Sequence, residues 1–560
     1  MMSRKFLLQH SLLLTAAMIP LSVPAAADSF TIVDGQVVNT TQELNAPGDV
    51  GIVASGGVID APNSGIFSTA DGVTIRNAGS VTGTGVGDFE GITGIFSLMN
   101  NNTIFNEGQS EALVTGDFAL ATGVMANNES SITNSGLAWG AAVGVASTAT
   151  GIEAFDGNII ENSGSSVADA VGDSSTATGI RLDNSNTLLN SGSIESTAAG
   201  TEVQAFGIAA AEFNDITNLG DIVVRVEGET ARALGISTAE NNLIINRGLI
   251  DIEAAGSNAS ATGVWASADA PTPGAPGNDI LNEGTIRVVA EGDAASARGI
   301  QGYNGNSTTN AGTLTVLASG ARSYALGVSF VNDGEIFNSG DILVQATGIE
   351  ARSIGLLFGG NPGTIANSGH LLSRAVGAGA LAAGIAHYGG TVDMNNAGSL
   401  AAMAEGESAI AYGINAVGYF HLTNTGVISA TASGEGSESY GVVASGFGNT
   451  ITNCGTIIGG TAAVKFEDAG NTLNLCGQSH IAGALLLGEG NALNVDLGRG
   501  ANAVLHYEGS PTVTVSGAAH VVVDNTIAVV DPTGFAAQDE MLTDLTRVIA
   551  DSIDAIGDRR

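Results

Sequence analysis

Several residue types that define common protein classes are scarce in this sequence. It contains 2 cysteines and 10 prolines in 560 residues, and aromatic side chains make up 5%. Two cysteines cannot support a scaffold held together by many disulfides. Collagen needs abundant proline and glycine at every third position, so the scarcity of proline excludes it.

Positive charge is also scarce. Lys and Arg number 17 against 55 Asp and Glu, which gives a formal net charge of -38. Nucleic acid binding depends on clustered basic side chains, and we therefore expect no nucleic acid partner. The acids are interpreted as a solvated surface that keeps the chain soluble. Calcium binding is the alternative, although the acids do not recur in the nonapeptide that builds repeated calcium sites.

Glycine and apolar residues are what the chain has in excess. There are 80 glycines, about twice the usual share of ~7%, and the apolar fraction is 44% against 13% charged residues. Disorder requires low hydrophobicity and abundant charge, so this chain is expected to fold. Because it is low in the residues that fill helices, we expect β structure.

The first segment has the form of a secretory signal peptide over residues 1–27. Arg4 and Lys5 precede an apolar stretch, and three alanines ending at Ala27 provide a small-residue cleavage site. No later run of about 18 uninterrupted apolar residues could span a bilayer as a helix. We therefore expect an exported protein.

One repeat accounts for most of the chain. The tripeptide Asn-x-Gly recurs with a spacing of 28 or 29, except for one interval of 36. A glycine stands 17 residues after each of the first thirteen of these asparagines, from Gly94 to Gly441. The repeated asparagines are Asn77, Asn106, Asn134, Asn162, Asn190, Asn218, Asn246, Asn282, Asn310, Asn338, Asn367, Asn396, Asn424 and Asn453.

Apolar residues alternate with polar or small ones within each repeat, as expected for short strands with one inward face. Ile stands two residues before most of the asparagines, Ile or Leu four residues after many, and a third strand would carry Ala-x-Gly-Ile. Three strands per repeat without a long helix predict an all-β fold, a single right-handed parallel β-helix. Equivalent asparagines would then stack about 4.8 Å apart as a structural amide ladder.

The pattern divides the chain into segments. After the signal peptide, residues 28–76 are expected to form an N-terminal cap and the first coils, and residues 77–460 the repeat β-helix. Residues 461–525 are predicted as shorter coils, because the motif that begins at Asn471 already returns at Asn491. Residues 526–560 would form a junction and an amphipathic linker helix, with an apolar side made of Met541, Leu545, Val548, Ile549, Ile553 and Ile556.

This order of segments resembles the bacterial autotransporters of type V secretion. The shared features are a signal peptide, a Gly- and Asn-rich β-helical passenger, shorter last coils, the junction Val530-Asp531-Pro532-Thr533-Gly534 and a linker helix. The resemblance covers nearly the whole chain and implies a passenger at the cell surface or in the extracellular medium. Autotransporters end in a membrane β-barrel, which the resemblance would place on a missing or separate segment. Without the barrel, the expected location is the periplasm.

No catalytic or cofactor motif stands out. The sequence lacks H-E-x-x-H, G-x-S-x-G and P-loop patterns, and we expect no cofactor and no metal. The leading hypothesis is an adhesin-like or matrix interaction protein without catalysis, whose partner is a host or matrix protein or glycan surface. The alternative is a polysaccharide-processing β-helix enzyme, which needs a carboxylate cluster with a basic partner. A pure spacer role is also open.

Aromatic residues in the later coils lie three to seven residues past the glycine that stands 17 residues after the repeated asparagine. Stacking would align them as a stripe on one edge, where exposed rings make effective contact residues. The alternative is that the rings fold back over the Ala-rich strand. These candidate binding residues are Tyr303, Phe330, Phe358, Tyr388, Tyr419, Phe420 and Phe447.

The two cysteines are expected to form a disulfide. Cys454 and Cys476 each precede a glycine, and their separation matches the length of one shortened coil. Such a coil would stack them about 4.8 Å apart, inside the range of about 4.4–6.8 Å between the Cα atoms of a disulfide. Two adjacent free thiols are the alternative.

Overall fold

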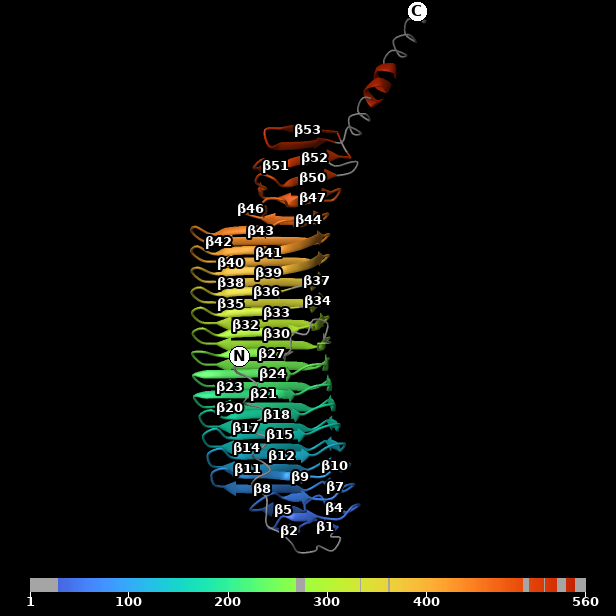
Figure 1. Ribbon diagram of the computed structural model, residues 1–560, viewed down its shortest axis with the longest axis vertical. Coiled ribbons are helices and arrows are strands. Elements are labelled where there is room, and N and C mark those ends of the chain that lie inside the picture. The colour runs from blue at the N-terminus through green and yellow to red at the C-terminus, as the bar shows by residue number, and fades with distance from the viewer. Residues whose placement is uncertain are drawn as a thin grey trace, which may run out of the picture.

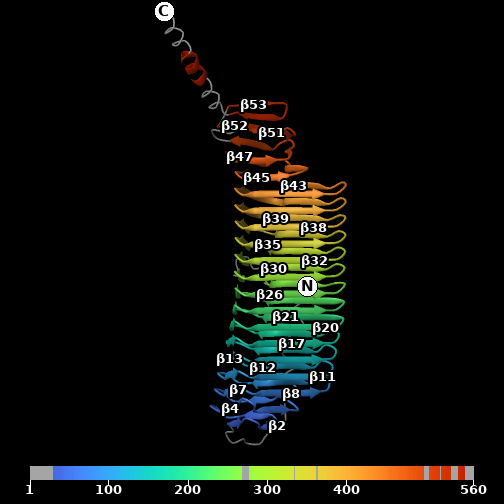
Figure 2. The ribbon, with the colours of Figure 1, turned by 180° about the vertical axis from the view of Figure 1, so that it is seen from behind.

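Each coil of the protein is built from three short strands. The computed structural model describes residues 29–267, 277–332, 334–360, 363–496, 503–517, 519–530 and 540–548. These residues form an all-β parallel solenoid of about 15 turns with coils of roughly 28 residues, followed by one helix over residues 540–548. Figure 1 shows the coils stacked along the long axis, and Figure 2 shows the stack from behind. The predicted fold class, an all-β parallel solenoid, is confirmed.

The strands that end in the repeated asparagine stack into one parallel sheet, the first-strand sheet. Asn134 pairs with Asn162 in register, and the same register joins each later pair of these strands. The strands of this sheet are β1 (Phe30–Ile32), β4 (Val50–Val53), β7 (Thr74–Asn77), β10 (Thr103–Asn106), β13 (Ser131–Asn134), β16 (Ile159–Asn162), β19 (Thr187–Asn190), β22 (Asp215–Asn218), β25 (Leu243–Asn246), β28 (Asp279–Asn282), β31 (Ser307–Asn310), β34 (Gly334–Asn338), β37 (Gly363–Asn367), β44 (Thr450–Asn453), β47 (Thr472–Cys476), β50 (Ala492–Asp496) and β52 (Thr512–Ser516).

The strands that follow the Asn-x-Gly turn form the second-strand sheet, which is also parallel. Its strands are β2 (Val37–Val38), β5 (Val58–Ala61), β8 (Ser80–Val86), β11 (Gln109–Thr115), β14 (Leu137–Val143), β17 (Ser165–Val171), β20 (Ser193–Ala199), β23 (Asp221–Glu227), β26 (Leu249–Ala255), β29 (Thr285–Glu291), β32 (Thr313–Ser319), β35 (Asp341–Thr347), β38 (His370–Val376), β40 (Ser399–Glu405), β42 (Val427–Ser433), β45 (Thr456–Gly459) and β48 (His480–Ala482).

The third-strand sheet contains the glycine that stands 17 residues after the repeated asparagine. In two coils its strand runs on into the first-strand sheet, so that β39 and β41 belong to both sheets. Its strands are β3 (Gln42–Leu44), β6 (Ile66–Ser68), β9 (Gly91–Ser97), β12 (Leu120–Ala126), β15 (Thr148–Ala154), β18 (Thr176–Leu182), β21 (Glu202–Ala210), β24 (Thr230–Thr238), β27 (Ser260–Ala266), β30 (Ser296–Asn304), β33 (Tyr324–Asn332), β36 (Arg352–Gly359), β39 (Leu381–Asn396), β41 (Ile410–Asn424), β43 (Glu438–Ser445), β46 (Ala462–Phe466), β49 (Leu485–Leu486) and β51 (Ala503–Glu508).

The repeated asparagines form an unbroken ladder of side-chain amides. Asn190 Nδ2 donates to Asn218 Oδ1 at 2.7 Å, and Asn218 Nδ2 donates to Asn246 Oδ1 at 2.8 Å. The same bond joins every neighbouring pair from Asn77 to Asn453. All fourteen side chains are buried, so each amide satisfies the next inside the solenoid and the predicted ladder is confirmed.

A second asparagine ladder lies four residues before the first and was not predicted. Asn158 Nδ2 donates to Asn186 Oδ1 at 3.1 Å, and the backbone N–H of Asn158 donates to the same oxygen at 2.8 Å. The pattern Asn-x-x-x-Asn was present in the sequence as a signal. The series runs through Asn158, Asn186, Asn214, Asn242, Asn278 and Asn306.

Close contact between coils explains the invariant glycines. A Cβ atom added at Gly220, in the Asn-x-Gly turn, would collide with the carbonyl oxygen of Gly192 one coil earlier. Glycine also recurs ten residues after each of the first thirteen repeated asparagines, a regularity the sequence analysis missed. At one such site, Gly144 has φ +151, and an added Cβ would collide with the carbonyl of Gly116. The stack therefore requires a residue without a side chain at these turns.

The largest hydrophobic core cluster runs through the solenoid from Ile32 to Val529. The isoleucines two residues before the repeated asparagines are buried, and Ile132, Ile160 and Ile244 have no exposed surface. The alternation of the strands supplies this inward face. None of the described helical residues forms a segment long and apolar enough to cross a membrane.

The two ends of the solenoid differ from the central coils. The N-terminal coils are shorter, because Phe30 pairs with Gly51 and Val50 pairs with Thr74. The last coils shorten as predicted, since Thr472 pairs with Ala492. The predicted signal peptide and the helix residues Ile549, Ile553 and Ile556 lie outside the described residues.

Residues 526–530, at the start of the expected junction, form a strand whose pairing the sequence did not indicate. These residues form β54 (Thr526–Val530), which pairs antiparallel with β51 and with β53 (Ala519–Val523). Asp524 and Asn525 both have positive φ and make the tight turn of this hairpin. The chain thus ends its coils with an antiparallel hairpin that pairs with β51.

A disulfide joins Cys454 and Cys476, with their Cα atoms 5.1 Å apart. The spacing of one shortened coil therefore brings the two cysteines together, as expected from the sequence.

Replacing a central amide of the first ladder tests its contribution to stability. Asn218→Ala should lower the free energy of unfolding by about 2–4 kcal/mol, since each buried polar group left without a partner costs roughly 1–3 kcal/mol. Denaturant unfolding and hydrogen exchange of the neighbouring coils would measure the loss. Asn332→Ala is the control, because Asn332 Nδ2 donates to Asn304 Oδ1 at the surface. Equal effects of the two substitutions would contradict a special role for the buried ladder.

Candidate binding surface

Some side chains on the outer side of the third-strand sheet are buried, although they do not belong to the main core cluster. In β36, Leu356 and Phe358 belong to the core cluster, whereas Ile354 and Leu357 pack in a separate cluster. Inward positions thus lie one and three residues after Gly355, and outward positions lie one before and two after it. Since a regular strand alternates strictly between faces, the alternation slips by one residue at this glycine. We call the glycine at this place in each coil the bend glycine.

Parallel pairing turns the outward positions into rows along the solenoid axis. The row three residues before the bend glycine contains Arg232, Ser260, Ser296, Tyr324 and Arg352. The row one residue before it contains Leu234, Thr262, Arg298, Leu326 and Ile354. The row two residues after it contains Ser237, Trp265, Gln301, Ser329 and Leu357.

Cationic and aromatic side chains gather in these rows between β24 and β36. The Arg232 guanidinium carbon lies 5.3 Å from the centroid of the Trp265 ring. The Trp265 and Tyr303 rings are 5.6 Å apart, and the Arg298 guanidinium lies 6.0 Å from the Tyr324 ring. We call this group the basic aromatic patch, which comprises Arg232, Trp265, Arg298, Tyr303, Tyr324 and Arg352.

The arginines of the patch have no acidic partner within the part of the chain that the structure describes. Among the described residues, no carboxylate lies within ion-pair distance of Arg232, Arg298 or Arg352. Of the twelve Lys and Arg side chains among the described residues, six form ion pairs, and the three patch arginines belong to the other six. These three guanidiniums are therefore available to an anionic ligand.

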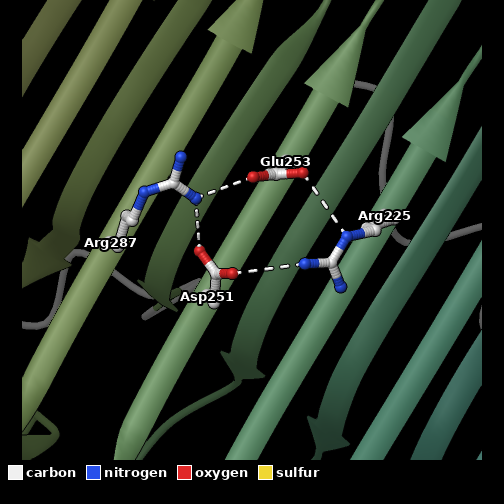
Figure 3. Close-up of polar contacts among 4 residues, drawn as sticks. All are labelled: Arg225, Asp251, Glu253 and Arg287. Carbon is white, nitrogen blue, oxygen red and sulfur yellow. Dashed lines mark hydrogen bonds and ion pairs between the residues drawn. The ribbon is translucent and has the colours of Figure 1, made fainter.

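Arginines on the second-strand sheet of nearby coils behave differently. Figure 3 shows Arg225 and Arg287 on either side of Asp251 and Glu253, which share strand β26. Arg287 Nη1 lies 2.6 Å from Asp251 Oδ1 and 2.7 Å from Glu253 Oε1, and Arg225 Nη2 lies 3.3 Å from Asp251 Oδ2. The hydrogen bond from Arg287 lowers the pKa of Glu253. The two arginines and the two carboxylates of this network compensate each other's charge, so neither arginine is as available to an anionic ligand as those of the patch.

Burial changes the ionisation of the patch. Burial lowers the pKa of Arg232, and the neighbouring Arg298 guanidinium lowers it further. Burial also raises the pKa of Tyr324, against the opposing effect of Arg298 and Arg352. Partly desolvated cations interact more strongly with an anion than cations surrounded by water.

Two polar atoms beside Arg298 lack hydrogen-bond partners. The Ser296 hydroxyl and the Gln301 side-chain oxygen are both shielded from solvent and make no hydrogen bond in the structure. They lie on the same strand as Arg298, in the outward rows on either side of it. Buried polar groups normally form hydrogen bonds. These two atoms form none within the protein, so they can still pair with a ligand.

Three of the aromatic residues predicted for binding are core residues instead. Phe330 is 1% exposed, and Phe358 and Phe420 are 0% exposed. Phe330 and Phe358 lie three residues after the bend glycine, which is an inward position. The expectation that they form a contact stripe is therefore wrong, because the slip in alternation reverses their direction.

The other four predicted aromatics remain outside the core. Tyr303 is partly buried and belongs to the basic aromatic patch. Tyr388, Tyr419 and Phe447 are 49%, 53% and 63% exposed. Tyr388 pairs with Val417 rather than with Tyr419, so these rings do not stack in one register. The patch residues that were not predicted from the sequence are Arg232, Trp265, Arg298, Tyr324 and Arg352, although their fixed offsets from the bend glycine were a usable signal.

A carboxyl pair beside an arginine lies on the same outer face, closer to the N-terminus. Glu153 and Arg181 each stand two residues after a bend glycine, with Oε1 and Nη1 3.6 Å apart. Burial raises the pKa of Glu153, which Arg181 opposes and Asp183 reinforces. Burial also raises the pKa of Asp183. Raised carboxyl pKa values beside a cation are a feature of some acid–base sites.

Other candidate chemistry is limited. The described residues contain no group of three or more His, Cys, Asp and Glu side chains placed to hold a metal ion. His387 occupies an inward position in β39 and its Nδ1 lies 3.2 Å from the carbonyl oxygen of Phe358. Burial lowers the pKa of His387, in keeping with a neutral core residue.

Comparison with protein families, with curated proteins and with solved structures found no significant match to this chain.

The raised pKa of Glu153 predicts how stability depends on pH. In the unfolded chain this carboxyl ionises near its ordinary value of 4.5, and in the folded protein at higher pH. The folded protein therefore favours the protonated form of Glu153. The contribution of this carboxyl to the free energy of unfolding is fully present below the unfolded pKa and is lost as pH rises through the folded pKa. Glu153→Gln should raise the melting temperature at pH 7, and the difference should vanish near pH 4.

A carboxyl with the opposite shift provides the control. Hydrogen bonds from the Thr201 hydroxyl and backbone lower the pKa of Asp173. Asp173→Asn should therefore destabilise the protein at pH 7, with the effect disappearing as pH falls through the folded pKa. If the stability of the two variants depended on pH in the same way, the pKa of Glu153 would not be raised in the folded protein.

Proposed function

We propose that this chain is an exported, non-catalytic binding rod that acts as an adhesin-like or matrix interaction protein. The observation that carries the proposal is the basic aromatic patch. Three guanidiniums with no carboxylate partner among the described residues lie beside aromatic side chains on a chain of formal net charge -38. A structural role alone gives no reason to keep these cations, of which Arg232 and Arg298 are partly buried and Arg352 is exposed, away from the abundant acids.

The solenoid suits presentation of a surface. Parallel ladders join successive coils on three sheets, so side chains in one row hold fixed spacings of about 4.8 Å per coil. A rod can also present several weak contacts at once, and such contacts reinforce one another through effective concentration. The partner in this proposal is a protein or glycan of a host or matrix surface.

Export is the second element of the proposal. It is supported by the signal-like residues 1–27 and by the disulfide between Cys454 and Cys476, a bond that persists in oxidising compartments. The order of a solenoid, shorter last coils and a C-terminal helix also fits the autotransporter resemblance. We therefore propose a passenger-type protein that acts at the cell surface or outside the cell.

An attachment assay tests the proposed function by comparing two variants that each lose three arginines, one set from the patch and one set from the second-strand sheet. The triple variant Arg232→Gln, Arg298→Gln and Arg352→Gln should weaken attachment of the exported protein to host cells or matrix by roughly ten-fold or more, since a charged hydrogen bond contributes about 1.5–3 kcal/mol. The control is Arg225→Gln, Arg287→Gln and Arg374→Gln, which removes the same charge from the second-strand sheet. Circular dichroism would verify folding of both. Equal attachment by the two triple variants would reject the proposal.

A second candidate function is supported by the Glu153 and Asp183 carboxyls beside Arg181. A polysaccharide-processing enzyme requires a carboxylate cluster with a basic partner, and two carboxyls with raised pKa values fit acid and base roles. Release of reducing ends from acidic polysaccharides would detect it. Release that is abolished in Glu153→Gln would favour the enzyme, whereas no release from the wild-type protein would reject it.

A further inference from the structure

We infer that the basic aromatic patch binds an acidic oligosaccharide, a sugar chain bearing carboxylates, laid along the solenoid axis. This inference rests on the proposed binding function and specifies its ligand class. The patch offers guanidiniums, ring faces and unpaired polar atoms together. An acidic sugar combines the matching groups, which are a carboxylate, an apolar ring face and hydroxyls.

The guanidiniums supply recognition of charge. Arginine donates from a planar fork that matches the two oxygens of a carboxylate. Arg232, Arg298 and Arg352 lie in alternate coils, so successive guanidiniums are two coils, or about 9.6 Å, apart along the axis. This spacing favours a ligand whose negative charges are separated rather than adjacent.

The aromatic and polar groups favour a sugar over other anions. Trp265 and Tyr303 lie 5.6 Å apart with their rings tilted by 54°, and Arg232 lies over the Trp265 ring. These rings therefore do not form the parallel stacking platforms that single-stranded nucleic acid uses. The Ser296 hydroxyl and Gln301 oxygen, which have no hydrogen-bond partner in the protein, are the groups that ligand hydroxyls would pair with.

The direction of the bound chain follows from the rows. Arg232 and Arg352 stand in the same row, four coils or about 19 Å apart. Leu326 and Ile354 occupy the middle row beyond Arg298, which gives the C-terminal side of the patch an apolar floor. A chain laid across the coils would reach only one of the three arginines, whereas a chain along the axis reaches all three.

Trp265 provides a local reporter for the test. The chain has 2 tryptophans, and the other, Trp139, donates from Nε1 to Asp169 on the second-strand sheet. In a full-length Trp139→Phe background, tryptophan fluorescence reports on the patch alone. Titration would use oligogalacturonate, neutral galactose oligomers of equal length, an acidic peptide and a single-stranded oligonucleotide.

The expected result is a saturable fluorescence change with oligogalacturonate. Arg298→Gln should raise the dissociation constant about ten-fold or more, since a hydrogen bond between charged groups contributes at least that factor. Arg374→Gln should leave it unchanged, because Arg374 pairs with Glu405 on the second-strand sheet. No fluorescence change, an equal response to the neutral oligomer, or tighter binding of the peptide or oligonucleotide would overturn the inference.

The attachment assay separates this inference from the proposed function. Attachment that depends on the patch arginines, in a protein that does not bind oligogalacturonate, would reject the ligand class and leave the function standing. Oligogalacturonate binding at the patch, with attachment unaffected by the same arginine substitutions, would reject the function and leave the ligand class standing.

Discussion

The structure depends on the hydrogen-bond spacing between successive coils. Parallel strands lie about 4.8 Å apart, so every residue meets its equivalent in the coil before and after it. An asparagine at such a position can donate to one neighbour and accept from the other, which produces the ladder through Asn190, Asn218 and Asn246. Where the turns bring backbones together, only glycine fits, as at Gly220. The amide ladders and the invariant glycines are consequences of one distance.

The same constraint organises the surface into rows. A side chain on the outer face is located by its coil and by its offset from the bend glycine, so a few substitutions in nearby coils create a local chemistry. Arg225 and Arg287 flank the acids of β26 and form a neutralised network (Figure 3). Arg232 and Arg298 stand in alternate coils on the third-strand sheet, and their rows contain no acid between β24 and β36. The repeat fixes the positions of the outer side chains, and the residues that differ between coils determine which ligand the surface can bind.

The sequence predicted what repeats and failed where the regular pattern changes. Asn-x-Gly spacing gave the coils and the first ladder, and the distance between Cys454 and Cys476 gave the disulfide. Strict alternation would point Phe330 and Phe358 outward, whereas the slip at the bend glycine, which is a property of the folded strand, points them inward. The antiparallel β54 was not predicted, since local sequence does not reveal which neighbour a terminal strand will pair with. The patch arginines were missed because their meaning depends on which acids lie nearby.

Net charge and local charge act over different distances in this molecule. At physiological ionic strength charges are screened over about 8 Å, which is less than the separation of about 9.6 Å between alternate coils. Acidic side chains several coils away are therefore largely screened at the patch, while they still keep separate rods apart. A guanidinium in contact with its ligand, partly removed from water like Arg232, acts at a range where screening is weak. A strongly acidic rod can thus bind an anion, provided that the cations stand without acidic neighbours in one set of rows.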